Sequence, residues 1–162
     1  EDIQKLIALI VDRGGMVKNL HGQKNVYYQV NATYFSALGE SEQKLLLARA
    51  IQIFMPGKPQ IWYLDLFAGK NDHEAVKEAG EGGHKEINRT NLTDIQIREA
   101  LRTDVVQKQL ALLRFRSTSK AFTEDADIQI QSDGRKLMIR WSNSAAAAQL
   151  DVDFETGSFV IS

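Results

Sequence analysis

Hydrophobic residues recur at helical spacing in three stretches of the first 120 residues. Apolar positions within 3–10 lie on one face of a predicted helix, which the glycine pair at 14–15 ends. A second helix is predicted over 41–55 and is apolar almost all round, which indicates that other elements cover it on more than one side. A third helix begins near Asp104, and its apolar positions again follow a helical repeat.

Residues 60–68, QIWYLDLFA, form a nearly continuous apolar run between a proline and a glycine. Such a run predicts a strand that is covered on both faces, as in a parallel sheet. A polar loop over 16–25 and a short strand over 27–30 are also predicted. Because one parallel strand needs neighbouring strands for its hydrogen bonds, we expect the chain to be the tail end of a larger α/β domain.

The hydrophobic pattern changes to a period of two after Phe122. Apolar and polar residues alternate in three stretches, DIQIQ, KLMIRW and AAQLDVDF, and a short apolar stretch, SFVIS, follows. Asp133-Gly134 and Thr156-Gly157 are turn signals between them. This pattern predicts an antiparallel meander of about four strands. The predicted fold class is therefore α/β plus a small all-β domain, with the α/β part over 1–122 and the β domain over 123–162.

Composition narrows the classes of function. The formal net charge is −1 and the cations are scattered, so we expect no nucleic-acid partner. Apolar runs fall short of the ~20 residues of a membrane span, so no membrane partner is expected. The absence of cysteine is compatible with a reducing compartment. His21, His73 and His84 lack the spacing of a helical metal pair, so we expect no metal. The chain begins at Glu1 without a signal-like leader, which favours a piece of a longer chain over a trimmed end.

The long loop predicted over 69–92 carries the most concentrated chemistry. Its end, GGHKEINRTNL, holds two glycines, a histidine, two cations and two amides. The guanidinium of Arg89 suits hydrogen bonds to vicinal hydroxyls or a phosphate, although a solvated surface role is equally compatible with its position. His84 and Lys85 have a weaker case, because charged loop residues are usually solvated. Asp65, inside the apolar run, requires a structural partner such as an arginine or faces a ligand site.

Tyr28 and Gln29 are a second candidate pair. An aromatic ring beside an amide can stack on a sugar and bond its hydroxyls, but these residues can equally form the wall of an amphipathic strand.

Four segments together resemble the sucrose phosphorylase family of the α-amylase superfamily, glycoside hydrolase family 13. They lie in the family's order and are distributed between residues 28 and 122. The segments are YQVNATYFSALG (28–39), ARAIQIFMPGKPQIWYLDLFAGKND (48–72), INR (87–89) and VVQKQLALLRFRSTSKAF (105–122).

The resemblance implies the C-terminal portion of a (β/α)8 barrel, with 60–68 as its last strand, followed by the β domain. It implies a cytoplasmic enzyme without a cofactor that transfers glucose from an α-glucoside to inorganic phosphate with retention. The family's nucleophile, acid/base and supporting Asp lie earlier in its chain, so no catalytic residue is expected here. Tyr28 and Gln29 would line the acceptor and phosphate side, Arg89 would hold the glucosyl ring, and Asn88 would support that loop.

Two departures from the family pattern bear on the acceptor. Val26 replaces an acidic residue, and HKEINRTNL is more similar to relatives that act on glucosylglycerate or similar glucosides. His84 and Lys85 would then meet an anionic acceptor or brace the loop. Hydrolysis, transglucosylation and a non-catalytic structural module are the alternatives. The missing N-terminal part of the barrel is an expected partner, and an exposed barrel face would favour a homo-oligomer.

Overall fold

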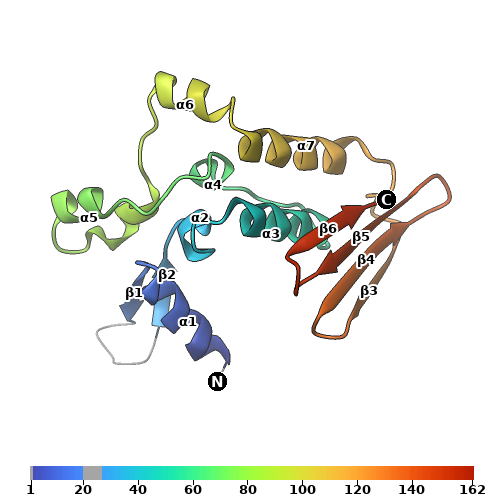
Figure 1. Ribbon diagram of the computed structural model, residues 1–162, viewed down its shortest axis with the longest axis horizontal. Coiled ribbons are helices and arrows are strands. Elements are labelled where there is room, and N and C mark those ends of the chain that lie inside the picture. Colours follow the sequence, from blue (N-terminus) through green and yellow to red (C-terminus); the bar gives the residue numbers. More distant parts are fainter. Residues whose placement is uncertain (1, 20–26) are drawn as a thin grey trace. The chain divides into compact units, whose positions relative to one another are not determined.

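The computed structural model describes residues 2–19 and 27–162, without the side chains of Tyr27 and Tyr28. His21 and Val26 lie outside the described residues. The chain forms two compact units, which Figure 1 shows with their elements labelled. Unit 1 comprises Glu1–Ser41 and Ile61–Arg102, and unit 2 comprises Glu42–Gln60 and Thr103–Ser162.

Unit 1 consists of short elements. They are α1 (Asp2–Asp12), β1 (Met16–Asn19), β2 (Tyr27–Asn31), α2 (Tyr34–Ala37), α4 (Tyr63–Leu66), α5 (His73–Ala79), the 3-10 helix η2 (Gly83–Asn88) and α6 (Asp94–Ala100). The predicted first helix is confirmed as α1. Thr93 and Gln96 form a capping box at the start of α6.

The expectation of a polar loop over 16–25 is wrong at its start. Residues 16–19 form β1, which pairs antiparallel with β2 from Met16 opposite Asn31 onwards. Gly14, at φ +82°, turns the chain between α1 and this hairpin. The short strand predicted over 27–30 is confirmed as β2.

The predicted strand over 60–68 is also wrong, because residues 63–66 form the one-turn helix α4 and no residue of the run is in a strand. The backbone N–H groups of Leu66 and Gly69 donate to the carbonyls of Trp62 and Leu64 over 3.1 and 2.8 Å. These local acceptors satisfy groups that a strand would offer to neighbours. Hydrophobicity alone cannot separate a buried strand from a buried turn of helix over so few residues. Among the described residues, both sheets are antiparallel.

The long loop predicted over 69–92 contains two helices rather than irregular structure. Asp72 caps α5 through a hydrogen bond of 2.9 Å from Ala75 N to its Oδ1. Gly82 adopts φ +86°, and a Cβ on Gly83 would lie 2.7 Å from Ala79 Cβ. The glycine pair of GGHKEINR therefore allows η2 to fold back tightly against α5.

Unit 2 combines two long helices with a four-stranded sheet. Helices α3 (Glu42–Phe54) and α7 (Asp104–Thr118) confirm the predicted helices. The strands β3 (Asp127–Ser132), β4 (Lys136–Ser142), β5 (Ala147–Asp153) and β6 (Ser158–Ile161) pair in chain order and confirm the meander. The domain boundary predicted near residue 122 stays a prediction.

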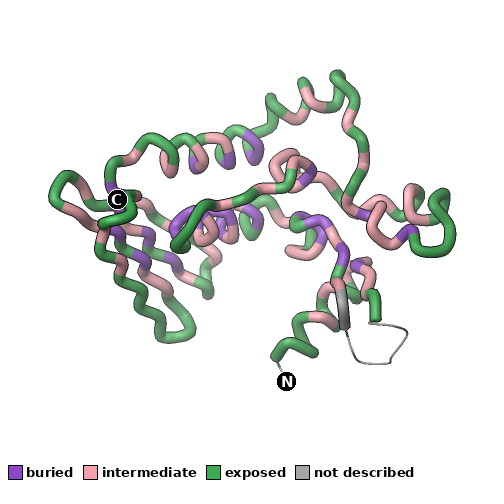
Figure 2. The backbone as a smooth tube through the Cα atoms, turned by 180° about the vertical axis from the view of Figure 1, so that it is seen from behind, coloured by how far each residue is buried: buried purple, intermediate pink, exposed green. Residues whose placement is uncertain are grey.

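The core of unit 2 lies between the helices and one face of the sheet. Buried residues alternate along β5, as Figure 2 shows in purple. Leu150, Ile139 and Phe54 are fully buried in one cluster. The indole Nε1 of Trp141 donates to the Phe54 carbonyl over 2.7 Å, which joins β4 to the end of α3.

A polar pair stabilises the helix packing in the same unit. Arg49 on α3 is only 2% exposed, and its Nε donates to Gln109 Oε1 on α7 over 2.9 Å. A buried guanidinium requires such acceptors. No helix in the described part of the chain is long and apolar enough to cross a membrane.

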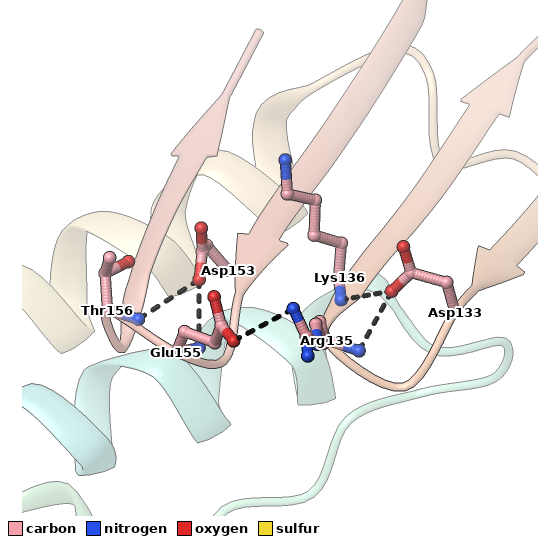
Figure 3. A network of polar contacts seen from close by, with 6 residues as sticks. All are labelled: Asp133, Arg135, Lys136, Asp153, Glu155 and Thr156. Carbon is pink, nitrogen blue, oxygen red and sulfur yellow. Dashed lines mark hydrogen bonds and ion pairs between the residues drawn. The ribbon is translucent and has the colours of Figure 1, made fainter.

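Two aspartates shape the hairpin turns of the meander (Figure 3). Asp133 Oδ1 accepts from the backbone N–H groups of Lys136 and Arg135, over 2.7 and 2.9 Å. Asp153 Oδ1 does the same for the turn before β6. The Lys136 N–H, above all, holds the pKa of Asp133 below its ordinary value. These carboxylates are therefore turn-forming groups.

Candidate substrate-binding site

The segment that carries Arg89 is fixed by side chains from α4 and the residue before it. Trp62 Nε1 donates to the Asn88 carbonyl over 2.8 Å. The Tyr63 hydroxyl donates to the Thr90 carbonyl over 2.7 Å. These two hydrogen bonds fix the residues on either side of Arg89 and so hold its backbone in place. The Arg89 side chain takes no part in them.

Asp72, which lies just before α5, also holds the Arg89 segment. Its backbone N–H donates to the Ile87 carbonyl over 2.8 Å, and its Oδ2 accepts from Thr90 Oγ1 over 2.8 Å. Ile87 is fully buried. Hydrogen bonds, first from the Ala75 N–H and then from the Thr90 hydroxyl, hold the pKa of Asp72 below its ordinary value. Asp72 is thus ionised at neutral pH and braces both ends of the Arg89 segment.

The guanidinium of Arg89 is available to a ligand. The side chain is 51% exposed, and Nη1 lies 3.7 Å from Glu86 Oε1. A pair of this length between half-exposed groups is weak, so an incoming hydroxyl or oxyanion can replace it. Because the backbone at Arg89 is fixed, only the rotamers of its side chain have to be ordered when a ligand binds.

Asn88 faces the chain that follows β2. Its Nδ2 donates to the Ala32 carbonyl over 3.3 Å. The next residue, Thr33, donates its N–H to Asn71 Oδ1 over 2.7 Å. Asn88 therefore holds its loop against a neighbouring one. The supporting role in the site that the resemblance implies for it stays a prediction.

His84 and Lys85 lie at the start of η2 in a region of positive charge. Within the described residues, His84 Nε2 is buried and has no hydrogen-bond partner. Burial and then the charges of Lys18 and Lys85 hold the pKa of His84 below its ordinary value of 6.5. The ammonium groups of Lys18 and Lys85 therefore both act on the neutral imidazole of His84. An anion beside His84 would be attracted by both of these positive charges.

Gln29 is brought to the same part of unit 1, because β2 packs against η2. Its Oε1 is buried and accepts no hydrogen bond from the described residues. The side chain of Tyr28 lies outside the part of the chain that the structure describes. The structure thus brings Gln29 into the neighbourhood of His84, Lys85 and Asn88, and leaves the predicted stacking role of Tyr28 a prediction.

Asp65 has a structural partner, which is one of the two alternatives that its place in the apolar run leaves open. Its Oδ1 accepts from the backbone N–H of Tyr34 over 2.7 Å, at the start of α2. A carboxylate at this end of a helix satisfies an N–H that lacks a partner within the helix. Among residues 2–19 and 27–162, no group of His, Asp and Glu side chains is arranged to hold a metal ion.

Trp62, Tyr63, Asn71 and Asp72 were missed by the sequence reasoning, although they build the site. Trp62 and Tyr63 lie inside the apolar run 60–68, where a strand interpretation hides which side chains reach other loops. Only Asp72 carries a local signal, since an aspartate before a helical stretch is a frequent N-cap.

The chain resembles known proteins over nearly its whole length, although no protein-family model matches it. A sucrose 6(F)-phosphate phosphorylase from Ilumatobacter coccineus is 51% identical, over 98% of this chain and 31% of the relative. One from Thermoanaerobacterium thermosaccharolyticum is 38% identical, over 94% of this chain and 32% of the relative. A glucosylglycerate phosphorylase from Spirochaeta thermophila is 30% identical, over 75% of this chain and 23% of the relative.

A solved structure matches the fold as well. The crystal structure of sucrose 6F-phosphate phosphorylase from Thermoanaerobacter thermosaccharolyticum superposes with a TM-score of 0.89 at 35% identity, covering 98% of this chain and 32% of that chain. The match confirms the predicted fold class, in which helices are followed by an antiparallel β domain. The chain spans about a quarter to a third of the length of these relatives. Over that span, it belongs to the sucrose phosphorylase family of α-glucoside phosphorylases.

Proposed function

We propose that the chain is the C-terminal part of a retaining α-glucosyl phosphorylase. The complete protein moves a glucosyl group from an α-glucoside to inorganic phosphate and releases α-glucose 1-phosphate. This chain supplies binding groups, and the preceding part of a (β/α)8 barrel supplies the nucleophile and the acid/base. The observation that carries the proposal is the Arg89 segment, which Trp62, Tyr63 and Asp72 fix while the guanidinium stays exposed.

Arg89 binds the transferred glucosyl group. Two adjacent guanidinium N–H groups match a pair of neighbouring hydroxyl oxygens, and the network fixes the backbone from which the side chain reaches them. Asn88 keeps the loop in register through its bond to Ala32. Gln29 Oε1, buried without a donor among the described residues, accepts from a hydroxyl of the acceptor.

The acceptor is an anion, of which fructose 6-phosphate is the first candidate. The charges of Lys18 and Lys85 converge on His84, so this part of unit 1 favours a negative group. A sugar phosphate is such a group, and a relative at 51% identity is named for sucrose 6(F)-phosphate. Glycerate, also an anion, is the second candidate, because a relative at 30% identity is a glucosylglycerate phosphorylase.

An acceptor panel tests the reaction and the acceptor together. The full-length protein is given glucose 1-phosphate as donor and fructose, fructose 6-phosphate, glycerate or glycerol as acceptor, and the release of phosphate is measured. Transfer to fructose 6-phosphate is expected. Transfer to glycerate alone would support an anionic acceptor but identify it as glycerate. A preference for fructose or glycerol would contradict the proposed role of His84 and Lys85 in binding an anionic acceptor. Hydrolysis without transfer would overturn the phosphorylase proposal.

The charged residues are tested by a matched pair of variants. Lys85→Ala removes a cation of the site, and Lys77→Ala removes an exposed cation from α5 in the same unit. We expect Lys85→Ala to lower kcat/KM for fructose 6-phosphate more than for fructose, and Lys77→Ala to change neither. An equal loss for both acceptors would assign Lys85 to the scaffold.

The 162-residue chain by itself is expected to have no turnover, because the proposed chemistry requires two carboxylates from the rest of the barrel. The measurement is the formation of glucose 1-phosphate by the purified chain. Its appearance would contradict the proposed division of labour. A purely structural module is the remaining alternative, and activity of the full-length protein that is lost in Arg89→Ala would exclude it.

A further inference from the structure

Unit 2 contains a groove of about 520 Å³ beside the second half of α7, outside the elements that carry the candidate substrate site. It lies between this helix and the turn that follows α3. The lining residues are Gly57, Lys58, Pro59, Leu113, Arg114, Arg116, Ser117 and Phe122. Three of them are cations and none is a carboxylate, which is unusual in a chain whose formal net charge is −1.

Arg116 is the fixed centre of this groove. Its guanidinium carbon lies 4.2 Å from the ring centroid of Phe122 and 4.7 Å from that of Trp141. Its Nη2 donates to the Gly57 carbonyl over 2.8 Å. Stacking on two rings together with a backbone hydrogen bond holds the guanidinium in one orientation.

The same guanidinium has hydrogen-bonding capacity left over. Arg116 Nη1 is buried and has no acceptor in the described part of the chain. Burial lowers the pKa of Arg116 from its ordinary value, which reflects the cost of shielding its charge from water. A buried charged donor without an acceptor is rare in folded proteins and indicates a missing anion or water.

The two other cations of the groove also lack an anionic partner. Within residues 2–19 and 27–162, neither Lys58 nor Arg114 is joined to a carboxylate by an ion pair. Both side chains are exposed, so they can turn towards a ligand without unpacking the core. The Ser117 hydroxyl adds a neutral polar group, and Leu113 and Phe122 give the groove an apolar floor.

We propose that this groove binds phosphate, either as inorganic phosphate or as the phosphate of a monoester. Lys58 and Arg114 contact the oxyanion from solvent, and Arg116 attracts it from the wall. The groove is large enough for the organic part of a monoester, which would lie on Leu113 and Phe122. The site rests on unit 2 alone and does not depend on the proposed reaction.

The test is a titration of the 162-residue chain that is followed by its backbone amide resonances. Inorganic phosphate and glucose 1-phosphate are added in separate experiments at constant ionic strength, with chloride as the reference anion. We expect saturable shifts of the amides of Gly57, Lys58 and Ser117. Binding of both ligands indicates recognition of the phosphate group, and binding of glucose 1-phosphate alone indicates that the apolar floor contributes.

Matched variants decide whether the cations of the groove cause these shifts. Lys58→Ala with Arg114→Ala is expected to weaken binding by about tenfold, since two charge-assisted contacts are lost. Arg135→Ala with Lys136→Ala removes the same charge at a hairpin turn of the same unit and should change the Kd by no more than about twofold. Lys58→Gln, a milder change, should also weaken binding.

Two results would overturn the proposal. One is that phosphate and glucose 1-phosphate move the groove amides no more than chloride does. The other is that the hairpin variant loses as much affinity as the groove variant, which would indicate a general effect of net charge.

Discussion

Thr90 Oγ1 donates a hydrogen bond of 2.8 Å to Asp72 Oδ2, across a separation of 18 residues. The other oxygen of the same carboxylate caps α5 at Ala75. One aspartate therefore joins the start of a helix to the end of the segment that presents Arg89. Local structure and site geometry in unit 1 depend on the same group.

Asp72→Ala is expected to destabilise unit 1 by about 1–2 kcal/mol, because the helix cap and the bond to Thr90 are both lost. Chemical denaturation followed by circular dichroism measures this change. Asp94→Ala is the matched control, because Asp94 is an exposed residue in the first turn of α6. A loss no larger than that of the control would show that Asp72 does not brace the segment.

Arg89→Ala in the full-length protein is expected to lower kcat/KM by about 10- to 100-fold, since a charge-assisted hydrogen bond to the donor sugar is worth about 1.5–3 kcal/mol. Arg98→Ala serves as the control, because Arg98 lies exposed on α6 of the same unit. Initial rates with glucose 1-phosphate measure both variants. An unchanged kcat/KM for Arg89→Ala would remove the role assigned to it.

His84 makes the stability of the folded chain depend on pH. In the unfolded chain its pKa has the ordinary value of 6.5, and burial with two neighbouring ammonium groups lowers it in the folded chain. Between the folded-state and unfolded-state pKa of His84, the unfolded state binds more protons than the folded state. The free energy of unfolding therefore rises with pH in this range. The contribution of His84 to stability is fully present above pH 6.5 and is lost as the pH falls through the folded-state pKa.

The variant His84→Gln isolates this effect, since glutamine does not titrate. We expect the unfolding free energy of the wild type, relative to that of the variant, to fall as the pH is lowered below about 6.5. Urea denaturation at a series of pH values measures it. A difference that stays constant with pH would mean that His84 titrates equally in the folded and unfolded chains.

Sequence patterns predicted the elements whose period was long and clear. The helices over 42–54 and 104–118 and the four strands after residue 126 follow directly from apolar spacing and turn residues. The run 60–68 was misassigned because uniform hydrophobicity carries no period. Backbone hydrogen bonds between residues four or five apart decided its structure, and composition does not reveal them.

The residues of the candidate site can be proposed from the sequence, but the contacts that hold its backbone cannot. The chemistry of the guanidinium singles out Arg89, and the resemblance carried by INR adds Asn88. The bonds of Trp62 and Tyr63 to backbone carbonyls 26 and 27 residues away could not. Such contacts depend on how loops approach each other, which local sequence does not encode.

Trp141 fixes the sheet of unit 2 to the end of α3. Its indole packs edge-on against Phe122 at 5.4 Å between ring centroids, and its Nε1 donates to the Phe54 carbonyl. Trp141→Phe removes the donor, leaves a buried carbonyl without a partner and opens a small void. We therefore expect a loss of about 2–4 kcal/mol in unfolding free energy.

Trp62→Phe is the comparison, because Trp62 also donates to a carbonyl but is 48% exposed. Water can replace its hydrogen bond, so the expected loss is below about 1 kcal/mol. Calorimetry of the two variants distinguishes burial from hydrogen bonding as the cause. Equal losses would mean that the buried position of Trp141 adds nothing, and that the sheet is held to the helices by the aliphatic contacts of Leu150 and Ile139 instead.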